Sequence, residues 1–201
     1  SISTFTQAGV LPVAPFSSSL CSYDPCVPQP GYDFLGLPSP RLDALSDRLM
    51  YRLQYRNLGA YQTLVTNHTV DVGGDRAGIR WYELRNSGSG WGIHQQGTYA
   101  PIDGLHRWMG SIAMDGAGNI ALGFSLGSRT ICPSIAYVGR QAGDLNPGVM
   151  TEAETVLVWG RGAQEDSSGR WGDYTSLSLD PTDDCTFWYT NEYLTYTDVI
   201  F

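Results

Sequence analysis

The sequence has no hydrophobic run that approaches the ~20 residues of a membrane-spanning helix. Positive charge is also scarce: 12 basic residues stand against 20 acidic ones, and the formal net charge is −8. Nucleic acids and anionic membrane surfaces are bound by clustered Lys and Arg, so this charge balance disfavours both. We therefore expect neither a membrane span nor a nucleic-acid partner.

The sequence also lacks an initiator Met and a charged-then-apolar leader at its start, so we expect a removed leader or a start inside a longer chain. Its four cysteines pair most simply as Cys21–Cys26 and Cys132–Cys185, with four free buried thiols as the alternative. Asn67 begins a glycosylation sequon. Disulfides and glycosylation belong outside the cytosol, so these features together predict a secreted protein.

What the chain has in abundance is glycine and aromatic residues, with 24 Gly and 12% aromatics against only 16% charged residues. This turn-rich, aromatic-rich profile predicts all-β architecture with no long helix. Residues 1–40 hold seven of the eleven prolines, so we expect an irregular segment there, clamped by Cys21–Cys26. Residues 41–201 carry the strands, and a single helical turn is predicted over 39–47.

Alternating and β-branched runs predict the strands individually. Residues 49–56 alternate between an apolar row and a polar row, and residues 61–72 and 78–85 pair as a hairpin around Gly73-Gly74-Asp75. The remaining expected strands are 91–99, 131–140, 154–160, the two copies of a repeated hairpin, and a final one that begins at Tyr193.

That repeated hairpin is the main organising feature of the sequence. One copy runs from Arg107 to Ser125 and the other from Arg170 to Thr190, each with an Arg-Trp pair before its first strand. When Asp115 is set on Asp180, further positions match: Ser111 with Ser176, Asn119 with Asp184, and Ser125 with Thr190. A third, weaker copy lies at 68–75, where Asp71 and Asp75 keep the four-residue step.

Strand-turn-strand units that recur in this way are typical of propeller blades. At about 65 residues per unit, the chain forms about three four-stranded blades, over residues 48–100, 101–160 and 161–201 plus a completing strand, whereas closed propellers have 4–8 blades. An open arc leaves unpaired edges and bare apolar faces. We therefore expect the remainder of a propeller, in the same precursor or in another chain, as the partner.

Several long motifs resemble a family of large, secreted, mostly uncharacterised propeller-like proteins. They cover nearly the whole chain: 47–53, 65–70, 77–85, 107–115 and the complete 170–190 unit. The resemblance implies that these residues are part of a propeller, and it implies no particular reaction. The acidic turns are also similar to the Asp-box of sialidase-like propellers, but Gly118 stands one place too late and the second copy has no turn glycine.

The turn acids have two readings. Asp and Asn side chains accept backbone N–H bonds within their own turns, which is the structural reading. Asp180, Asp183 and Asp184 could instead offer three oxygens to calcium, which needs six to eight. No other cofactor is indicated. Arg107 and Arg170 are each followed by Trp, and we expect each Trp to pack between blades with its arginine stacked or paired to a carboxylate. The alternative places both arginines at a ring centre, where they hold an anionic ligand.

Candidate catalytic residues are few. His68 beside Asp71 is a candidate acid–base pair, with a core histidine as the alternative, while Glu83 and Glu192 are candidate carboxylates for glycoside chemistry. The predicted ligand-binding residues combine aromatic rings with arginines. They are Arg80, Trp81, Tyr82, Trp91, Arg107, Arg170, Trp188 and Tyr189.

These features favour an extracellular propeller-type module that binds a glycan or a protein. Two alternatives remain: a carbohydrate-active hydrolase or lyase whose site is completed by residues outside the chain, and a subunit of an extracellular assembly. A pocket with two carboxylates and an arginine indicates the enzyme, a flat aromatic strip indicates binding, and strand pairing across chains indicates the assembly.

Overall fold

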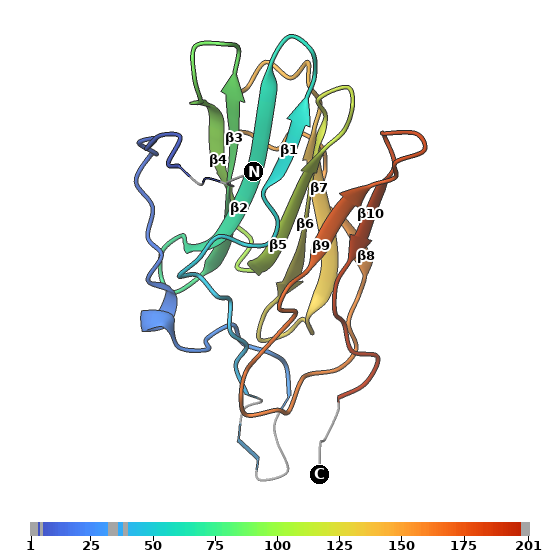
Figure 1. Cartoon of the computed structure of the whole chain (residues 1–201). Coiled ribbons are helices and arrows are strands. Elements are labelled where there is room, and N and C mark those ends of the chain that lie inside the picture. The colour runs from blue at the N-terminus through green and yellow to red at the C-terminus, as the bar shows by residue number, and fades with distance from the viewer. Residues whose placement is uncertain (1–3, 5, 32–35, 38–39, 198–201) are drawn as a thin grey trace.

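The computed structural model describes residues 4, 6–31, 36–37 and 40–197, and shows three antiparallel β-sheets (Figure 1). The first sheet is formed by β1 (Gln54–Asn57), β2 (Gln62–Asp71), β3 (Ala77–Asn86) and β4 (Gly92–Tyr99). The second is formed by β5 (His106–Met114), β6 (Ile120–Gly127), β7 (Ser134–Arg140) and β8 (Thr155–Val158). A hairpin of β9 (Ser176–Leu179) and β10 (Phe187–Thr190) makes the third. The all-β prediction is confirmed.

The first two sheets pack face to face around a shared apolar core. Trp81 of β3, Ile112 of β5 and Phe124 of β6 are all fully buried there. The hairpin lies on the other side of the second sheet, where Leu177 N donates to Ser111 Oγ over 2.8 Å. The second sheet is therefore the middle layer of an open stack, and the described residues form no closed barrel or propeller.

The described residues of the N-terminal segment form no strand, and they are attached to the rest of the chain at several points. The predicted Cys21–Cys26 disulfide is present. A backbone bridge joins Val27 to Leu42, and both side chains lie in a second apolar cluster with Trp108 and Trp171. The described part of the predicted helical turn at 39–47 contains no helix, and a single 3-10 turn, η1 (Leu20–Tyr23), occurs instead.

The two repeated hairpins are neighbours in space. The rings of Trp108 and Trp171 lie 6.5 Å apart between centroids, within one cluster. The two acidic turns meet at one end of the stack, where Gly116 N donates to the carbonyl of Asp184 over 3.0 Å. The Trp residues and the acidic turns that match in sequence therefore also lie next to each other in space.

The weaker third copy at 68–75 is wrong. Its turn joins β2 to β3 at the other end of the stack, since Ala77 N donates to His106 Nδ1 at the start of β5. The Asp115 turn follows the end of β5. β2 and β5 run in opposite directions, so the end of β5 lies beside the start of β2. The turn that lies next to the Asp115 turn is therefore the one between β1 and β2, which has a different sequence.

Two predicted covalent features do not fit this fold. Cys132 and Cys185 are free: Cys132 precedes β7 at the Trp108 end of the second sheet, whereas Cys185 lies in the turn beside Gly116 at the opposite end. Asn67 is 0% exposed in the middle of β2, facing Gly110 of β5. A glycan on Asn67 is incompatible with the two packed sheets.

The alternating run at 49–56 is a strand only from Gln54 onward, and its polar row faces inward. Gln54 exchanges two hydrogen bonds with the backbone of Met114, at 2.6 and 3.3 Å. The apolar row is on the outside instead: Leu49, Tyr51, Leu53 and Tyr55 are each more than half exposed. The final strand predicted from Tyr193 is absent through residue 197, and residues 198–201 lie outside the described part.

Candidate functional site

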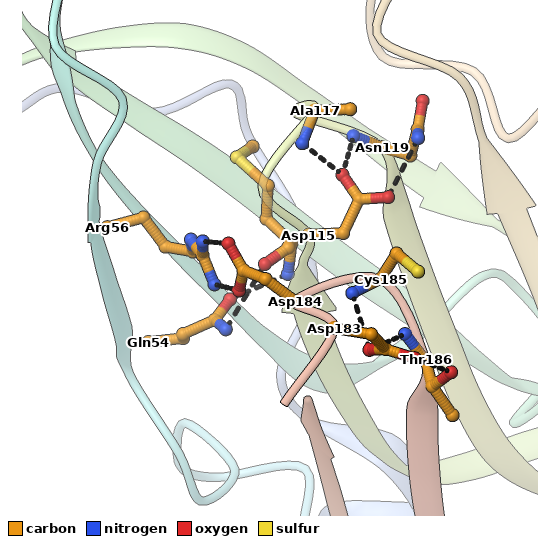
Figure 2. Close-up of polar contacts among 10 residues, drawn as sticks. Gln54, Arg56, Asp115, Ala117, Asn119, Asp183, Asp184, Cys185 and Thr186 are labelled. Atoms are coloured by element: carbon orange, nitrogen blue, oxygen red, sulfur yellow. Dashed lines mark hydrogen bonds and ion pairs between the residues drawn. The ribbon is translucent and has the colours of Figure 1, made fainter. Parts of the chain in front are cut away.

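The acidic turn of the first repeat is stabilised by its own carboxylate (Figure 2). Asp115, 4% exposed, accepts hydrogen bonds from Ala117 N at 2.9 Å and from Asn119 N and Nδ2 at 2.8 Å. Both carboxylate oxygens are thus used within five residues, which is the structural role predicted from Asx chemistry.

The second turn uses two of its three acids, Asp180 and Asp183, in the same way. Asp180 accepts from Thr182 and from Trp188 Nε1 at 3.0 Å, and Asp183 accepts from Cys185 N at 3.0 Å and Thr186 N at 2.9 Å. Hydrogen bonds from Thr186 and from the backbone lower the pKa of Asp183 to about 2. These carboxylates fold their turn, and no group of three or more His, Cys, Asp or Glu in the described residues is arranged to hold a metal ion.

Asp184 has a different task, because its side chain reaches another sheet. Arg56 of β1 donates two hydrogen bonds to it, at 2.7 and 2.5 Å, and this pairing lowers the pKa of Asp184 (Figure 2). The Asp184 carbonyl accepts from Gly116 N. One residue therefore joins the hairpin to both four-stranded sheets.

The two Arg-Trp pairs are also structural. Arg107 is 1% exposed and is held by Asp103 and Glu154, with two hydrogen bonds to each at 2.6–3.1 Å. Arg170 is 74% exposed and pairs with Asp173 at 2.5 Å. Each arginine meets a carboxylate, as the structural reading predicts, but Arg107 is too buried to hold a surface ligand.

His68 and Asp71 are not brought together. They are three residues apart on β2, so their side chains point to opposite faces of the sheet. His68 Nε2 instead lies 3.0 Å from the hydroxyl of Tyr82. Burial, and then the charge of Arg80, lowers the pKa of His68 to about 4. His68 is a neutral core histidine, which was the alternative reading.

Glu83 and Glu192 are also separated. Glu83 is fully buried and bonded to Arg85 and Gln95, both at 2.5 Å, at the Met114 end of the stack. Glu192 follows Asn191, which bonds Ser125 near the Trp108 end. These two carboxylates therefore do not form the pair that glycoside hydrolysis requires.

Most of the predicted aromatic strip is inside the protein. Trp81 and Tyr82 are 0% and 5% exposed, and Arg80 is 7% exposed and bonded to Gln96 and Thr98. Neighbours in a strand point to opposite faces, but both faces of β3 are covered here. Of the remaining predicted residues, Trp91 and Tyr189 are half-buried and Trp188 is 61% exposed.

A polar hollow lies at the open end of the hairpin. Of the residues that line it, the sequence indicated only Glu192 as a candidate. It has a volume of about 360 Å³ and is lined by Gly172, Asp173, Tyr174, Thr175, Thr190, Asn191 and Glu192. We call it the Asp173 hollow. Asp173 and Tyr174 were missed because no motif singles them out, although they directly follow the repeated Arg-Trp pair. The hollow brings Asp173 and Glu192 together, with Arg170 bonded to the first.

An apolar groove lies beside the hairpin, on the outer face of the second sheet. It has a volume of about 340 Å³ and is lined by Ala121, Tyr137, Leu157, Leu177, Phe187 and Tyr189. The hairpin packs closely on β6, since a Cβ on Gly123 would lie 2.5 Å from the Tyr189 ring. On β7 and β8, however, Tyr137 and Leu157 remain 38% and 52% exposed. We call this surface the open half of the second sheet.

Comparison with known proteins finds no match of any kind. No family model matches the chain, and neither a curated protein nor a solved structure is similar to it. Within the part of the chain that the structure describes, no helix has the length and apolar character needed to cross a bilayer.

Proposed function

We propose that this protein is an extracellular structural and binding module, one section of a propeller-type β-array, whose third sheet is completed by strands of a partner polypeptide. The observation that carries the proposal is the open half of the second sheet beside the free edge of β10. Among the described residues, the first two sheets have four strands each and the third has two. The missing two strands are the ones that would cover β7 and β8.

The chemistry of this surface suits strand addition. β10 pairs only with β9 among the described strands, so its other edge offers backbone N–H and C=O groups to an incoming strand. Phe187 and Tyr189 line the groove, whereas Trp188 points outward. A partner strand with apolar side chains at alternate positions would continue this pattern over Tyr137 and Leu157. The groove also shares Leu177 and Tyr189 with the existing contact between the hairpin and the second sheet.

The extracellular setting is supported by the Cys21–Cys26 disulfide, since such bonds persist in oxidising compartments. The propeller-type arrangement is supported by the stacking of similar hairpins in chain order, with their acidic turns at the same end. Neither argument depends on the other.

The test uses a peptide with the sequence of residues 134–158, which covers β7 and β8. These are the third and fourth strands of the second sheet, the two positions for which the third sheet has no strand among the described residues. Calorimetry should show saturable binding of this peptide to the protein. Tyr137→Lys and Leu157→Lys should each weaken binding by about tenfold, because each buries a charge in the contact. Tyr55→Lys, a matched change on the first sheet, should leave binding unchanged.

The same variants test whether the surface is open at all. Each lysine substitution should alter the free energy of unfolding by less than about 0.5 kcal/mol, as expected for exposed positions. A large loss of stability, or a dimer in light scattering that Leu157→Lys dissociates, would show that the groove is already filled by this protein itself.

A carbohydrate-active hydrolase is the second candidate, and one observation favours it: the Asp173 hollow gathers two carboxylates and an arginine. However, both carboxylates already accept hydrogen bonds: Asp173 from Arg170, and Glu192 from Gly172 N at 2.9 Å. Such carboxylates are better arranged to accept hydrogen bonds than to supply a proton. Release of nitrophenol from 4-nitrophenyl glycosides, lost in Glu192→Gln, would support hydrolysis.

A further inference from the structure

The walls of the Asp173 hollow are fixed from below by hydrogen bonds. Thr175 Oγ1 donates to the carbonyl of Met109 over 2.8 Å, and Asn191 Nδ2 donates to the hydroxyl of Tyr189 over 2.8 Å. Asn191 Oδ1 accepts from Ser125 Oγ at 3.2 Å. These bonds tie the chain on both sides of the hairpin to the middle sheet. The hollow is therefore preorganised, which reduces the entropy lost when a ligand binds.

The upper rim presents hydrogen-bond acceptors. Arg170 donates only to Oδ2 of Asp173, and Gly172 N donates to Oε2 of Glu192. The second oxygen of each carboxylate, Oδ1 of Asp173 and Oε1 of Glu192, has no hydrogen-bond partner among the described residues. One oxygen of each carboxylate is thus unpaired, on the exposed Glu192 and on Asp173, whose side chain is 15% exposed, and can accept from a ligand that brings hydroxyl donors.

Tyr174 adds an apolar surface to the same hollow. Its side chain is 47% exposed, so part of the ring is available for contact. Aromatic rings with polar groups beside them present one apolar and one polar contact surface. A pyranose ring has the matching construction, with an apolar C–H face and hydroxyl groups around its edge.

Charge selects among sugars. The hollow is lined by two carboxylates and by no basic residue; Arg170 pairs with Asp173 and Arg48 hydrogen-bonds to Tyr174 at its edge, and the chain has a formal net charge of −8. Sialylated or sulfated sugars would be repelled by this negative charge, whereas the binding free energy of a neutral sugar would carry no such penalty. We propose that the Asp173 hollow binds a neutral carbohydrate, with a sugar ring against Tyr174 and its hydroxyls donating to Asp173 and Glu192. This site is separate from the open half of the second sheet and does not depend on strand addition.

The experiment begins with an array of immobilised neutral, sialylated and sulfated oligosaccharides probed with the whole chain. We expect binding to neutral members only. The best neutral oligosaccharide is then titrated by calorimetry, where Tyr174→Ala and Glu192→Gln should each weaken binding by about tenfold. Tyr55→Ala, which removes an exposed ring elsewhere, should bind like the wild type.

Two controls keep the outcome readable. Glu192→Gln preserves the side-chain shape, and its circular dichroism and melting temperature should match the wild type, so that lost binding reflects the ligand contact. Binding to no neutral oligosaccharide, binding to anionic members alone, or affinity unchanged in both hollow variants would overturn the proposal. The peptide experiment above reads a different surface, so either result can fail without the other.

Discussion

The two copies of the repeated hairpin have the same sequence pattern but different energetic roles. The first copy, β5 and β6, lies in the middle layer with a sheet on each side, so Arg107 and Asp115 are 1% and 4% exposed. The second copy, β9 and β10, is the outer layer, and Arg170 is 74% exposed. Position in the stack, rather than residue type, therefore decides how exposed each repeated interaction is, and we expect its contribution to stability to follow.

The largest expected difference between the copies is at the arginines. Arg107→Ala would leave Asp103 and Glu154 without their partner and should lower the free energy of unfolding by about 3 kcal/mol. Arg170→Ala removes an exposed ion pair and should lower it by less than about 1 kcal/mol. Chemical denaturation of both variants measures the difference. Equal losses would contradict the assignment of the middle layer.

A methyl group at Gly123 tests how closely the copies pack. A Cβ there would lie 2.5–2.8 Å from atoms of the Tyr189 ring, so Gly123→Ala should lower the free energy of unfolding by about 1–3 kcal/mol. The matched control is Gly92→Ala, also in a strand, where a Cβ meets nothing within 4 Å. Adding Tyr189→Ala to Gly123→Ala should recover part of the loss. Strict additivity in this double variant would show that the two residues do not touch.

The turn acids give a smaller contrast. Asp115→Ala removes the acceptor of three hydrogen bonds at a buried turn and should lower the free energy of unfolding by about 1–2 kcal/mol. Asp180→Ala removes a similar set in an exposed turn and should cost less. Thermal unfolding of both variants decides the order. The reverse order would mean that the second turn contributes more to stability than its exposure suggests.

The smallest expected effect depends on pH and concerns the link between the copies and β1. Pairing with Arg56 lowers the pKa of Asp184 in the folded protein below its ordinary value. The stabilisation is therefore present above about pH 4 and is lost as the pH falls through the folded pKa. Asp184→Asn should be less stable than the wild type at pH 6, and the gap should close towards pH 2. A gap that persists at pH 2 would show that the effect is not electrostatic.

Much of the local structure was predictable. Residues 61–72 and 78–85 form the expected hairpin β2–β3, and the turns at Asp115 and Asp180 use their carboxylates as Asx chemistry predicts. The Cys21–Cys26 disulfide follows from two cysteines five residues apart. Each of these features depends on residues that are close in sequence, so spacing and residue type were sufficient.

Most of the errors concern contacts between distant residues; the helical turn expected at 39–47 and the strand expected from Tyr193, which the described residues do not form, are local exceptions. Cys132 and Cys185 do not pair because they lie at opposite ends of the second sheet. The sequon at Asn67 is not accessible because a second sheet covers that face of β2. The residues that line the Asp173 hollow were identified only in part. They come from two segments, 172–175 and 190–192, which are separated in sequence by the fourteen residues of the hairpin, 176–189.

By itself, the sequence determined that this protein is built from antiparallel strands, where its main hairpins turn, and that one hairpin pattern occurs twice. Alternation and side-chain bonds to the local backbone act over a few residues, so they can be read in order along the chain. Only the tertiary structure decided which copy is buried, that the apolar row at 49–55 faces outward, and that Asp173 and Glu192 share a hollow. Burial depends on which layer covers a face, and that is set by the packing of sheets distant in sequence.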